Sequence, residues 1–435
     1  MKLAIYMLPF QSHVSVLLSV AREMRRRGHE IVVLGLRDLE ERVAQEVGMT
    51  FVPMCDREYP LGATRAALAP LRSMSGIAGT EFCINMLTHL CAAVLEDGPR
   101  ALRESQAEAL ILDFSSRGMD AVAVSMDIPY VHISNAVHSD YSGNTPFWCY
   151  DWPPETTEEA LARNRAGLVR LAKAAAPMHA LLRSFLEEAG VDIAWSDLHA
   201  LTSKLAWLTQ IPPELDFKNS HWPKQLIHVG PLCQPPSMPD TNFPWHRLTG
   251  EPLIYVSFGT LQTDLFSLYE VVVKIARTKG YQIVLSTGGF PMDEKLKDIP
   301  DNLILVRFAP QVEILRQAAL CITHGGVNTV LEALQCGVPL VVLPITNDQP
   351  GVAARVAYAG VGAFCRVEDL NPSNLSGLID EVMQNPGYRA RAKQLQSVLS
   401  YERSIVRAGE YIEKALASVV ADHTEAAREH FAGSE

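Results

Sequence analysis

The sequence has no cysteine pair with metal-binding spacing, no Asp-x-Asp motif and no uninterrupted apolar run of about eighteen residues. Its eight cysteines are scattered without a Cys-x-x-Cys motif, which favours free thiols in a reducing cytoplasm over disulfides. Without a long apolar run, the sequence gives no indication of a transmembrane helix. The net charge of −11 argues against a nucleic-acid partner, because no basic surface is available to gather phosphates.

The amino terminus only superficially resembles a secretory signal. Its apolar run, residues 3–8, is interrupted early by Pro9 and His13, and four arginines lie between positions 22 and 27, where a cleavage site would be expected. These arginines are more simply interpreted as a solvated helix face than as a ligand site. We therefore expect the run to be the first buried strand of a cytoplasmic protein.

Short apolar runs alternate with longer helical patterns along the chain, as in α/β proteins with parallel sheets and crossover helices. With 435 residues, 48% of them hydrophobic, the chain is long enough for two such domains. Strands are predicted at residues 3–8, 30–34, 109–112 and 130–133 in the first half, and at residues 253–257, 282–285, 303–306, 320–323 and 340–343 in the second.

Proline marks the boundary between the two halves. The segment 230–239 is too rich in proline for a helix or an inner strand, so we expect a linker at 230–250 between domains at 1–229 and 251–395. A last helical pattern covers residues 386–417. It predicts a carboxyl-terminal helix at 396–420, followed by a disordered polar tail at 421–435.

The most informative motif begins at Thr323. Residues 319–323 form a predicted strand, and Gly325 and Gly326 allow the backbone to turn sharply and to approach a ligand. The helix that follows has its first amide groups at the positive end of the helix dipole, where phosphate oxygens are favoured. Glu332, one turn further, is placed to accept hydrogen bonds from ribose hydroxyls. The motif therefore predicts a site for a nucleoside diphosphate and its sugar.

Polar and glycine residues follow the predicted strands rather than precede them. In open parallel sheets ligands bind outside the carboxyl ends of the strands. Two sheets facing each other across a cleft would bring such residues together despite their separation in the sequence. The residues placed in this way are His13, Asp113, Gly259, Thr260, Thr287, Gly288, His324 and Asp348.

The segment from Phe308 to Gln349 resembles the signature of the family 1 glycosyltransferases, the UDP-glycosyltransferases with the GT-B fold. The resemblance implies an α/β protein with two Rossmann-like doubly wound domains facing a cleft, and a carboxyl-terminal helix that crosses back onto the first. It also implies a UDP-sugar donor substrate and no cofactor. The donor-site positions that it assigns are Gly259, Thr260, Thr287, Phe308, Ala309, Gln311, His324, Gly326, Asn328, Thr329, Glu332, Asp348 and Gln349.

The resemblance also assigns roles within this set. Many family members carry tryptophan where this chain has Phe308 and Val327. The resemblance therefore implies diphosphate binding more firmly than it implies the identity of the base, which distinguishes UDP from dTDP. In plant relatives, a glutamine at the position of Gln349 is associated with glucose. Glucose is therefore the expected sugar. The implied contacts are Gln311 with uracil or ribose, His324 and the Asn328 and Thr329 amides with the diphosphate, Glu332 with the ribose, and Asp348 and Gln349 with the sugar.

His13 is the candidate general base. It lies at the start of a predicted helix, where the positive dipole end favours the neutral ring that can accept a proton. A turn histidine bonded to backbone is an equally good interpretation of its position alone. The family resemblance, which places a histidine in this loop, favours the catalytic role.

Asp113 is the candidate partner that orients His13 and stabilises the imidazolium. The alternative is an N-cap for a helix beginning near residue 116, and Asp120, inside that helix, is a weaker candidate. With this pair, an acceptor hydroxyl would lose its proton to His13 and attack the anomeric carbon as UDP leaves from the opposite face, which inverts the configuration.

The histidines show no metal-binding spacing. His132 and His138 flank a strand end and His89 lies on an apolar helix, without a His-Glu-x-x-His or Cys-His pattern. We therefore expect core or pocket positions for them, with His138 a candidate for lining the acceptor site. Together with the missing Asp-x-Asp motif, this predicts a transfer that needs no metal.

The expected acceptor is a hydrophobic, hydroxylated small molecule. Residues 71–95 are unusually apolar and residues 147–150 add aromatic surface, although core packing is the simpler explanation for any single residue. A narrower resemblance, at residues 257–262 and 348–355, is to bacterial zeaxanthin glucosyltransferases, and it is thin in the acceptor-binding regions. It implies a carotenoid acceptor and peripheral contact with the inner face of the membrane. Sterols, phenolics, macrolides and other polyketides remain alternatives.

Two other classes of function fit parts of the pattern. A sugar-nucleotide epimerase shares the two-domain architecture but needs neither an acceptor nor a histidine in the first loop paired with Asp113. A non-catalytic sugar-nucleotide-binding protein would need neither of these side chains. The presence of both His13 and Asp113 favours an inverting hexosyltransferase.

Overall fold

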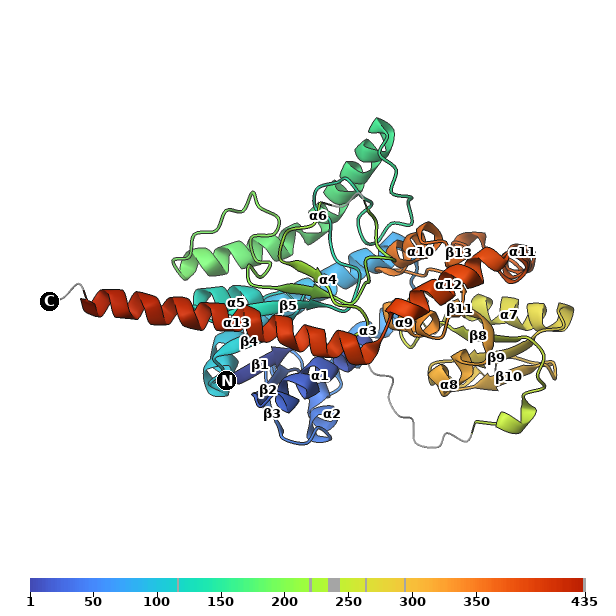
Figure 1. Ribbon diagram of the computed structural model, residues 1–435, viewed down its shortest axis with the longest axis horizontal. Helices are drawn as coiled ribbons and strands as arrows, with labels where there is room; N and C mark the ends of the chain where they lie inside the picture. Colours follow the sequence, from blue (N-terminus) through green and yellow to red (C-terminus); the bar gives the residue numbers. More distant parts are fainter. Residues whose placement is uncertain (116, 219–220, 234–242, 263, 293–294, 433–435) are drawn as a thin grey trace.

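The structure is a computed structural model that describes residues 1–432 except 116, 219–220, 234–242, 263 and 293–294. It contains two parallel sheets, each covered by helices on both faces (Figure 1), which confirms the predicted α/β architecture. The first sheet has the order β3-β2-β1-β4-β5-β6-β7 and the second the order β10-β9-β8-β11-β12-β13.

The first sheet consists of β1 (Lys2–Tyr6), β2 (Glu30–Gly35), β3 (Met49–Pro53), β4 (Ala109–Asp113), β5 (Tyr130–Ser134), β6 (Trp207–Thr209) and β7 (Leu226–His228). The second consists of β8 (Leu253–Ser257), β9 (Gln282–Ser286), β10 (Leu303–Val306), β11 (Ala318–Thr323), β12 (Leu340–Val342) and β13 (Gly362–Phe364). All nine predicted strands are present. The sequence missed β3, β6, β7 and β13, because strands of three residues and a half-exposed edge strand lack a long apolar run.

Helices on opposite faces bury the two sheets. In the first domain, α1 (Gln11–Arg26) covers one face, and α4 (Gly76–Ser105), α5 (Met119–Ser125) and α6 (Glu158–Glu188) cover the other. In the second, α8 (Gln311–Leu315), α9 (Val327–Gln335), α10 (Gln349–Tyr358) and α12 (Pro386–Val398) lie opposite α7 (Phe266–Thr278) and α11 (Pro372–Gln384). Shorter helices are α2 (Glu40–Ala44), α3 (Ala63–Leu68) and the 3₁₀ turns Arg37–Leu39, Ala69–Ser73, Trp245–Arg247 and Val367–Asp369.

The last helix, α13 (Tyr401–Ala432), crosses back onto the first domain, as the resemblance implied (Figure 1). Its buried residues Ile405, Ala408 and Ile412 pack with α1, and Glu413 accepts a 2.7 Å hydrogen bond from Arg27. The helix extends to residue 432, through the segment from 421 that was expected to be a tail. Of the predicted linker at 230–250, residues 234–242 lie outside the described residues, as do 433–435 of the tail.

No helix long and apolar enough to span a membrane was expected from the sequence, and α4 differs from that expectation. Among the described residues it is the one helix that is long and apolar enough, by length and composition, to cross a bilayer. Isolated polar residues such as Thr80 and His89 interrupt its apolar run without lowering its mean hydropathy far. In the structure it packs against α5, α6, β2 and β3 of the first domain.

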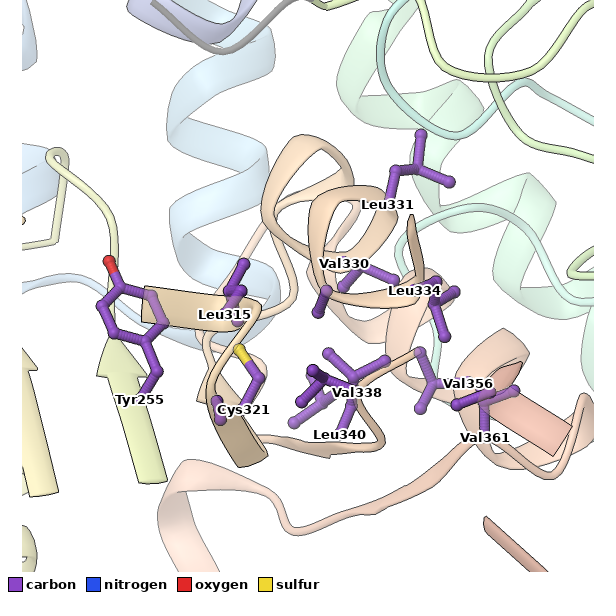
Figure 2. Packing of buried hydrophobic residues seen from close by; sticks show 14 of the residues in the cluster. Tyr255, Leu315, Cys321, Val330, Leu331, Leu334, Val338, Leu340, Val356 and Val361 are labelled. Atoms are coloured by element: carbon purple, nitrogen blue, oxygen red, sulfur yellow. The ribbon is translucent and has the colours of Figure 1, made fainter. Parts of the chain in front are cut away.

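The donor-site motif is anchored by the core beneath α9. Figure 2 shows Val330 and Leu334 of this helix lying above Cys321 of β11 and Leu340 of β12. All four side chains are fully buried. Because α9 is held by this packing, its amino-terminal turn has a fixed position relative to the strand ends.

Truncation of this core should destabilise the second domain. We expect Leu334→Ala to lower the unfolding free energy by about 2–5 kcal/mol, because the site cannot collapse around the lost methyl groups. Leu61→Ala, at a position that is 74% exposed, should change it by about 0.5 kcal/mol or less. Urea denaturation of both variants tests this; equal midpoints would contradict the packing described for α9.

Candidate active site

His13 and Asp113 meet at the carboxyl edge of the first sheet. His13 lies in the first turn of α1, directly after β1, and Asp113 is the last residue of the neighbouring strand β4. The distance between His13 Nδ1 and Asp113 Oδ2 is 2.6 Å. Asp113 is fully buried, whereas His13 retains 13% exposure of its side chain. The pair therefore has a buried carboxylate and a ring that still reaches the surface of the domain.

The alternative roles of these carboxylates are also visible. Asp113 Oδ1 accepts a 3.0 Å hydrogen bond from the Ser115 amide, so it stabilises the following turn as well. It does not cap α5, which begins at Met119 after Gly118; residue 116 is outside the described residues. Asp120 is buried and accepts hydrogen bonds from the amides of Gly118 and Ala121, which makes it a local structural residue.

The glycines of the donor motif allow three segments to approach closely. Strands β8 and β11 are neighbours, and the ring of His324 lies against Gly259 and Gly326. A Cβ atom at Gly259 would lie 2.8 Å from this ring, and one at Gly326 would lie 2.9 Å from it. Gly325 has a φ of +94°, which favours glycine. Larger residues at these positions would displace His324.

The amino terminus of α9 points its backbone amides at the same place. No side chain of the described residues caps this turn, whose first residues include Asn328 and Thr329. Uncapped amide groups at a helix amino terminus favour an anion. Burial lowers the pKa of the neighbouring His324 to about 4, so its ring is neutral near pH 7 in the ligand-free protein.

Gln311 and Glu332 contact each other beside α9. Gln311 donates a hydrogen bond from Nε2 to the Glu332 carboxylate, and its Oε1 accepts one from the Tyr255 hydroxyl at 2.8 Å. Burial raises the pKa of Glu332 to about 7, although the bond from Gln311 opposes this shift. The structure thus brings the two predicted nucleoside contacts together.

The remaining nucleotide-side residues differ in accessibility. Phe308 is 57% exposed, and its ring lies close to Gly289, so its face is available for a base. Thr260 is exposed as well, whereas Ala309 is buried. The buried Thr287 hydroxyl donates a 2.6 Å hydrogen bond to the Phe290 carbonyl, so its side chain is engaged in a local turn.

Asp348 and Gln349 lie where the two domains meet. Asp348 Oδ2 accepts a 3.1 Å hydrogen bond from the Val137 amide of the first domain. Burial raises the pKa of Asp348, and this amide and the nearby His13 partly offset the shift. Gln349 Oε1 accepts hydrogen bonds from the amides of Ile345 and Thr346, which leaves its NH₂ group for another partner.

The sequence missed two residues that contact this site across the domain boundary. Gln210 Nε2 donates a 2.9 Å hydrogen bond to Asn328 Oδ1 of α9, and Val137 binds Asp348 as described. Both follow strands of the first sheet, β6 and β5. The rule that ligand residues follow strands would have found Gln210 if β6 had been recognised.

The three histidines for which a core or pocket position was expected lie in different environments. His132 is a core residue, and its Nδ1 accepts a 3.1 Å hydrogen bond from the Ser203 amide. His89 is exposed. His138 is buried and bonded to Asp216 at 2.9 Å, and with His228 these form the one group in the described part of the chain that could hold a metal ion.

Comparisons with known proteins agree with the fold. Residues 282–402 match the family model of the C-terminal domain of erythromycin biosynthesis protein CIII-like proteins. The chain is 26% identical to zeaxanthin glucosyltransferase of Pantoea ananas over 94% of both chains. The solved glycotransferase of kitacinnamycin has a TM-score of 0.73 at 22% identity, over 95% of this chain and 98% of that one. Glycosyltransferase VinC in complex with DTDP has a TM-score of 0.67 at 21% identity, over 95% and 99%.

The raised pKa of Glu332 predicts a pH-dependent stability. The folded state binds the proton of the Glu332 carboxyl more tightly than the unfolded chain does. The contribution of this group to the free energy of unfolding is therefore complete below about pH 4.5 and is lost as pH rises through about 7. Between about pH 5 and pH 8, the free energy of unfolding of the wild type should therefore fall by up to about 3 kcal/mol relative to that of Glu332→Gln. Urea denaturation across this range measures the difference; Glu313→Gln, at an exposed glutamate of α8, controls for the lost charge. A pH-independent difference for Glu332→Gln would contradict the assignment.

Proposed function

We propose that this chain, which is a glycosyltransferase with the GT-B fold, moves glucose from UDP-glucose to a hydroxyl of a hydrophobic small molecule with inversion at the anomeric carbon. The observation that carries the proposal is the 2.6 Å pair of His13 and Asp113 in one domain. It stands opposite the donor motif of the other domain, and Asp348 is near enough to His13 for their charges to interact.

His13 is the proposed base. Its Nδ1 faces the Asp113 carboxylate and carries the proton that this contact requires, so Nε2 is free to take a proton from the acceptor hydroxyl. Asp113 then stabilises the imidazolium that forms. The deprotonated oxygen attacks the anomeric carbon as the bond to UDP breaks on the opposite face, so a single displacement inverts the configuration.

The diphosphate gains charge as it leaves. The amides at Asn328 and Thr329 are fixed in position by the core beneath α9 and act as preorganised donors for this charge. His324, neutral in the ligand-free protein, serves as a hydrogen-bond donor there, and the exposed Thr260 hydroxyl adds a further donor. In this arrangement no residue requires a bound metal.

The nucleoside would lie between Phe308 and Glu332. The exposed ring of Phe308 offers a stacking surface for uracil, and Gln311 and Glu332 offer an amide and a carboxyl group to the ribose hydroxyls. Asp348 and the free NH₂ group of Gln349 are the proposed sugar contacts, with glucose preferred. The structurally similar VinC was solved with DTDP. A dTDP-sugar is therefore the donor to compare with the UDP-sugar in each assay.

Apolar side chains of the first domain supply the proposed acceptor surface. Phe147, Cys149 and Leu171 form a small buried cluster, against which half-buried residues of α4 and of the 141–150 segment pack, including Ile77, Ile84, Tyr141, Trp148 and Tyr150. Half-buried apolar groups beside the domain boundary suit a hydrophobic ligand. The similarity to zeaxanthin glucosyltransferase favours a hydroxylated carotenoid, handled by a cytoplasmic enzyme that touches the inner face of the membrane.

A panel of acceptors tests the reaction directly. With UDP-glucose, we expect mass spectrometry to show a single added hexose on a hydroxylated carotenoid, and weaker or no transfer to sterols, phenolics and macrolides. Replacing UDP-glucose by dTDP-glucose or UDP-galactose should reduce the rate. Release of free N-acetylhexosamine from a UDP-N-acetylhexosamine without an acceptor would indicate an epimerase, and binding of UDP-glucose without any turnover would indicate a binding protein.

The role of His13 has a separate test. His13→Ala should lower kcat by about 10²–10⁴-fold, because the general base is lost, while UDP binds as in wild type, since its contacts lie in the other domain. His246→Ala, at an exposed histidine of the 3₁₀ turn Trp245–Arg247, is the control and should transfer normally. Normal transfer by His13→Ala to an alcohol acceptor would remove His13 as the base.

Metal dependence has a test of its own. Because the proposed donors to the diphosphate are amides, His324 and Thr260, we expect activity to stay within about twofold of its initial value after dialysis against EDTA. Steady-state rates with and without added Mg²⁺ or Mn²⁺ measure this. Complete loss in EDTA, restored by either ion, would contradict a metal-independent transfer.

A further inference from the structure

A buried ion pair connects the two domains behind the candidate active site. Arg355 of α10 donates a 2.9 Å hydrogen bond from Nε to Asp216 Oδ1 in the first domain. Their side chains are only 1% and 3% exposed. The guanidinium also lies 4.2 Å from the centre of the Phe217 ring and donates to the Gly351 carbonyl. Burying two charges costs more than an apolar contact, so such a pair is better explained by the geometry that it fixes than by stability.

The same carboxylate is shared with the loop that follows β5. His138 Nε2 lies 2.9 Å from Asp216 Oδ2, and His138 Nδ1 lies 3.0 Å from the Thr209 hydroxyl. Since the Asp216 carboxylate can only accept, His138 Nε2–H donates to it; the buried ring is neutral, so its Nδ1 accepts a hydrogen bond from the Thr209 hydroxyl. Asp216 therefore accepts from His138 through Oδ2, while its Oδ1 is shared by Arg355 of α10 and the Phe217 amide.

This network reaches the proposed sugar contacts through two short connections. Val137, next to His138, donates its amide to Asp348 at the start of α10, and Arg355 lies about two turns further along that helix. Helix α10 is thus held against the first domain near both of its ends. Two fixed points leave the helix little freedom to shift or tilt, so they set where Asp348 and Gln349 stand relative to His13.

We propose that Asp216 and Arg355 are positioning residues, whose ion pair, shared with His138, holds the sugar-binding end of α10 at the distance from His13 that transfer requires. This inference rests on the proposed function of that site. Neither residue touches the donor or the acceptor; they act through Asp348 and Gln349. The four residues His138, Asp216, Arg355 and Val137 are called the clasp below.

A metal ion is the competing occupant of part of the clasp. The candidate ligand atoms of His138, Asp216 and His228 all lie within 4.8 Å of one another. However, Arg355 already neutralises Asp216, so a divalent cation would leave about two uncompensated positive charges in a buried position. His228 Nδ1 also donates to the Ile211 carbonyl at 2.8 Å, which anchors that ring without an ion. The ion pair is the arrangement that the surrounding charges favour.

The test compares Arg355→Met, Asp216→Asn and the double variant. Arg355→Met leaves a buried carboxylate without its cation and can lower stability; the double variant removes both charges and keeps the comparison valid if the single variant does not fold. We expect kcat to fall about 10–100-fold in each, because displacement of the sugar contacts misaligns the reacting atoms. The Kd of UDP should stay within about twofold, because the proposed UDP contacts all lie in the second domain. The double variant should be no worse than the worse single variant.

The chain offers a matched control on the same domain boundary. Arg366 pairs with Asp151 through hydrogen bonds of 2.6 and 3.0 Å, but its side chain is half exposed. Arg366→Met should therefore leave kcat within about twofold of wild type, since exposed pairs contribute little. Small-angle X-ray scattering of the ligand-free proteins should show a larger radius of gyration for the double clasp variant than for wild type or Arg366→Met.

Three results would contradict the proposed positioning role of the clasp. The first is full kcat in the double variant, and the second is a weakened Kd for UDP with kcat unchanged. The third is a stoichiometric metal in the purified wild type that is lost in His228→Ala. If wild type itself transfers no sugar to any acceptor, the proposed function fails, and the scattering comparison then decides on the clasp alone: unchanged radii in all variants would refute it.

Discussion

The parallel direction of every strand is the constraint on which the site depends. In both sheets the paired strands run parallel, so all strands of a sheet end at one edge, and the helices that follow begin there. One edge gathers His13 and Asp113, and the other gathers His324 and the amino terminus of α9. A parallel sheet must be covered on both faces, and the helices that cover it also fix these amino termini through their packed inner surfaces.

Burial controls the charge of the proposed donor site. It raises the pKa values of Glu332 and Asp348 and lowers that of His324, so each of these groups is biased towards its neutral form. The amides at the start of α9 carry only the partial charges of the helix dipole. A site built in this way avoids repulsion among its own groups, and under the proposed function the largest charge to enter it would be that of the diphosphate.

Contacts between the domains complete what neither domain provides alone. The proposed base and its partner belong to the first domain and the proposed donor motif to the second, so the relative position of the domains is part of the candidate site. Val137 and Gln210 reach across to Asp348 and Asn328, and Asp216 pairs with Arg355. Arg366 of the Arg366–Asp151 pair is half exposed, whereas the Asp216–Arg355 pair is buried and the bonds from Val137 and Gln210 are part-buried and made to residues proposed to bind the donor.

The sequence by itself determined the α/β class, nine of the strands and the location of the residues that follow them, because apolar runs and glycine turns are local features. Its family resemblance also supplied the GT-B fold and the crossing of the last helix. It did not reveal the short strands β6 and β7, nor the helical continuation of α13 through residues 421–432. Asp113 was already the candidate partner of His13, but their 2.6 Å separation, and the pairing of Asp216 with Arg355, 139 residues apart, were decided only by the tertiary structure. Such contacts depend on which strand edges and helices the fold places opposite each other, and no local pattern in the chain records that distance.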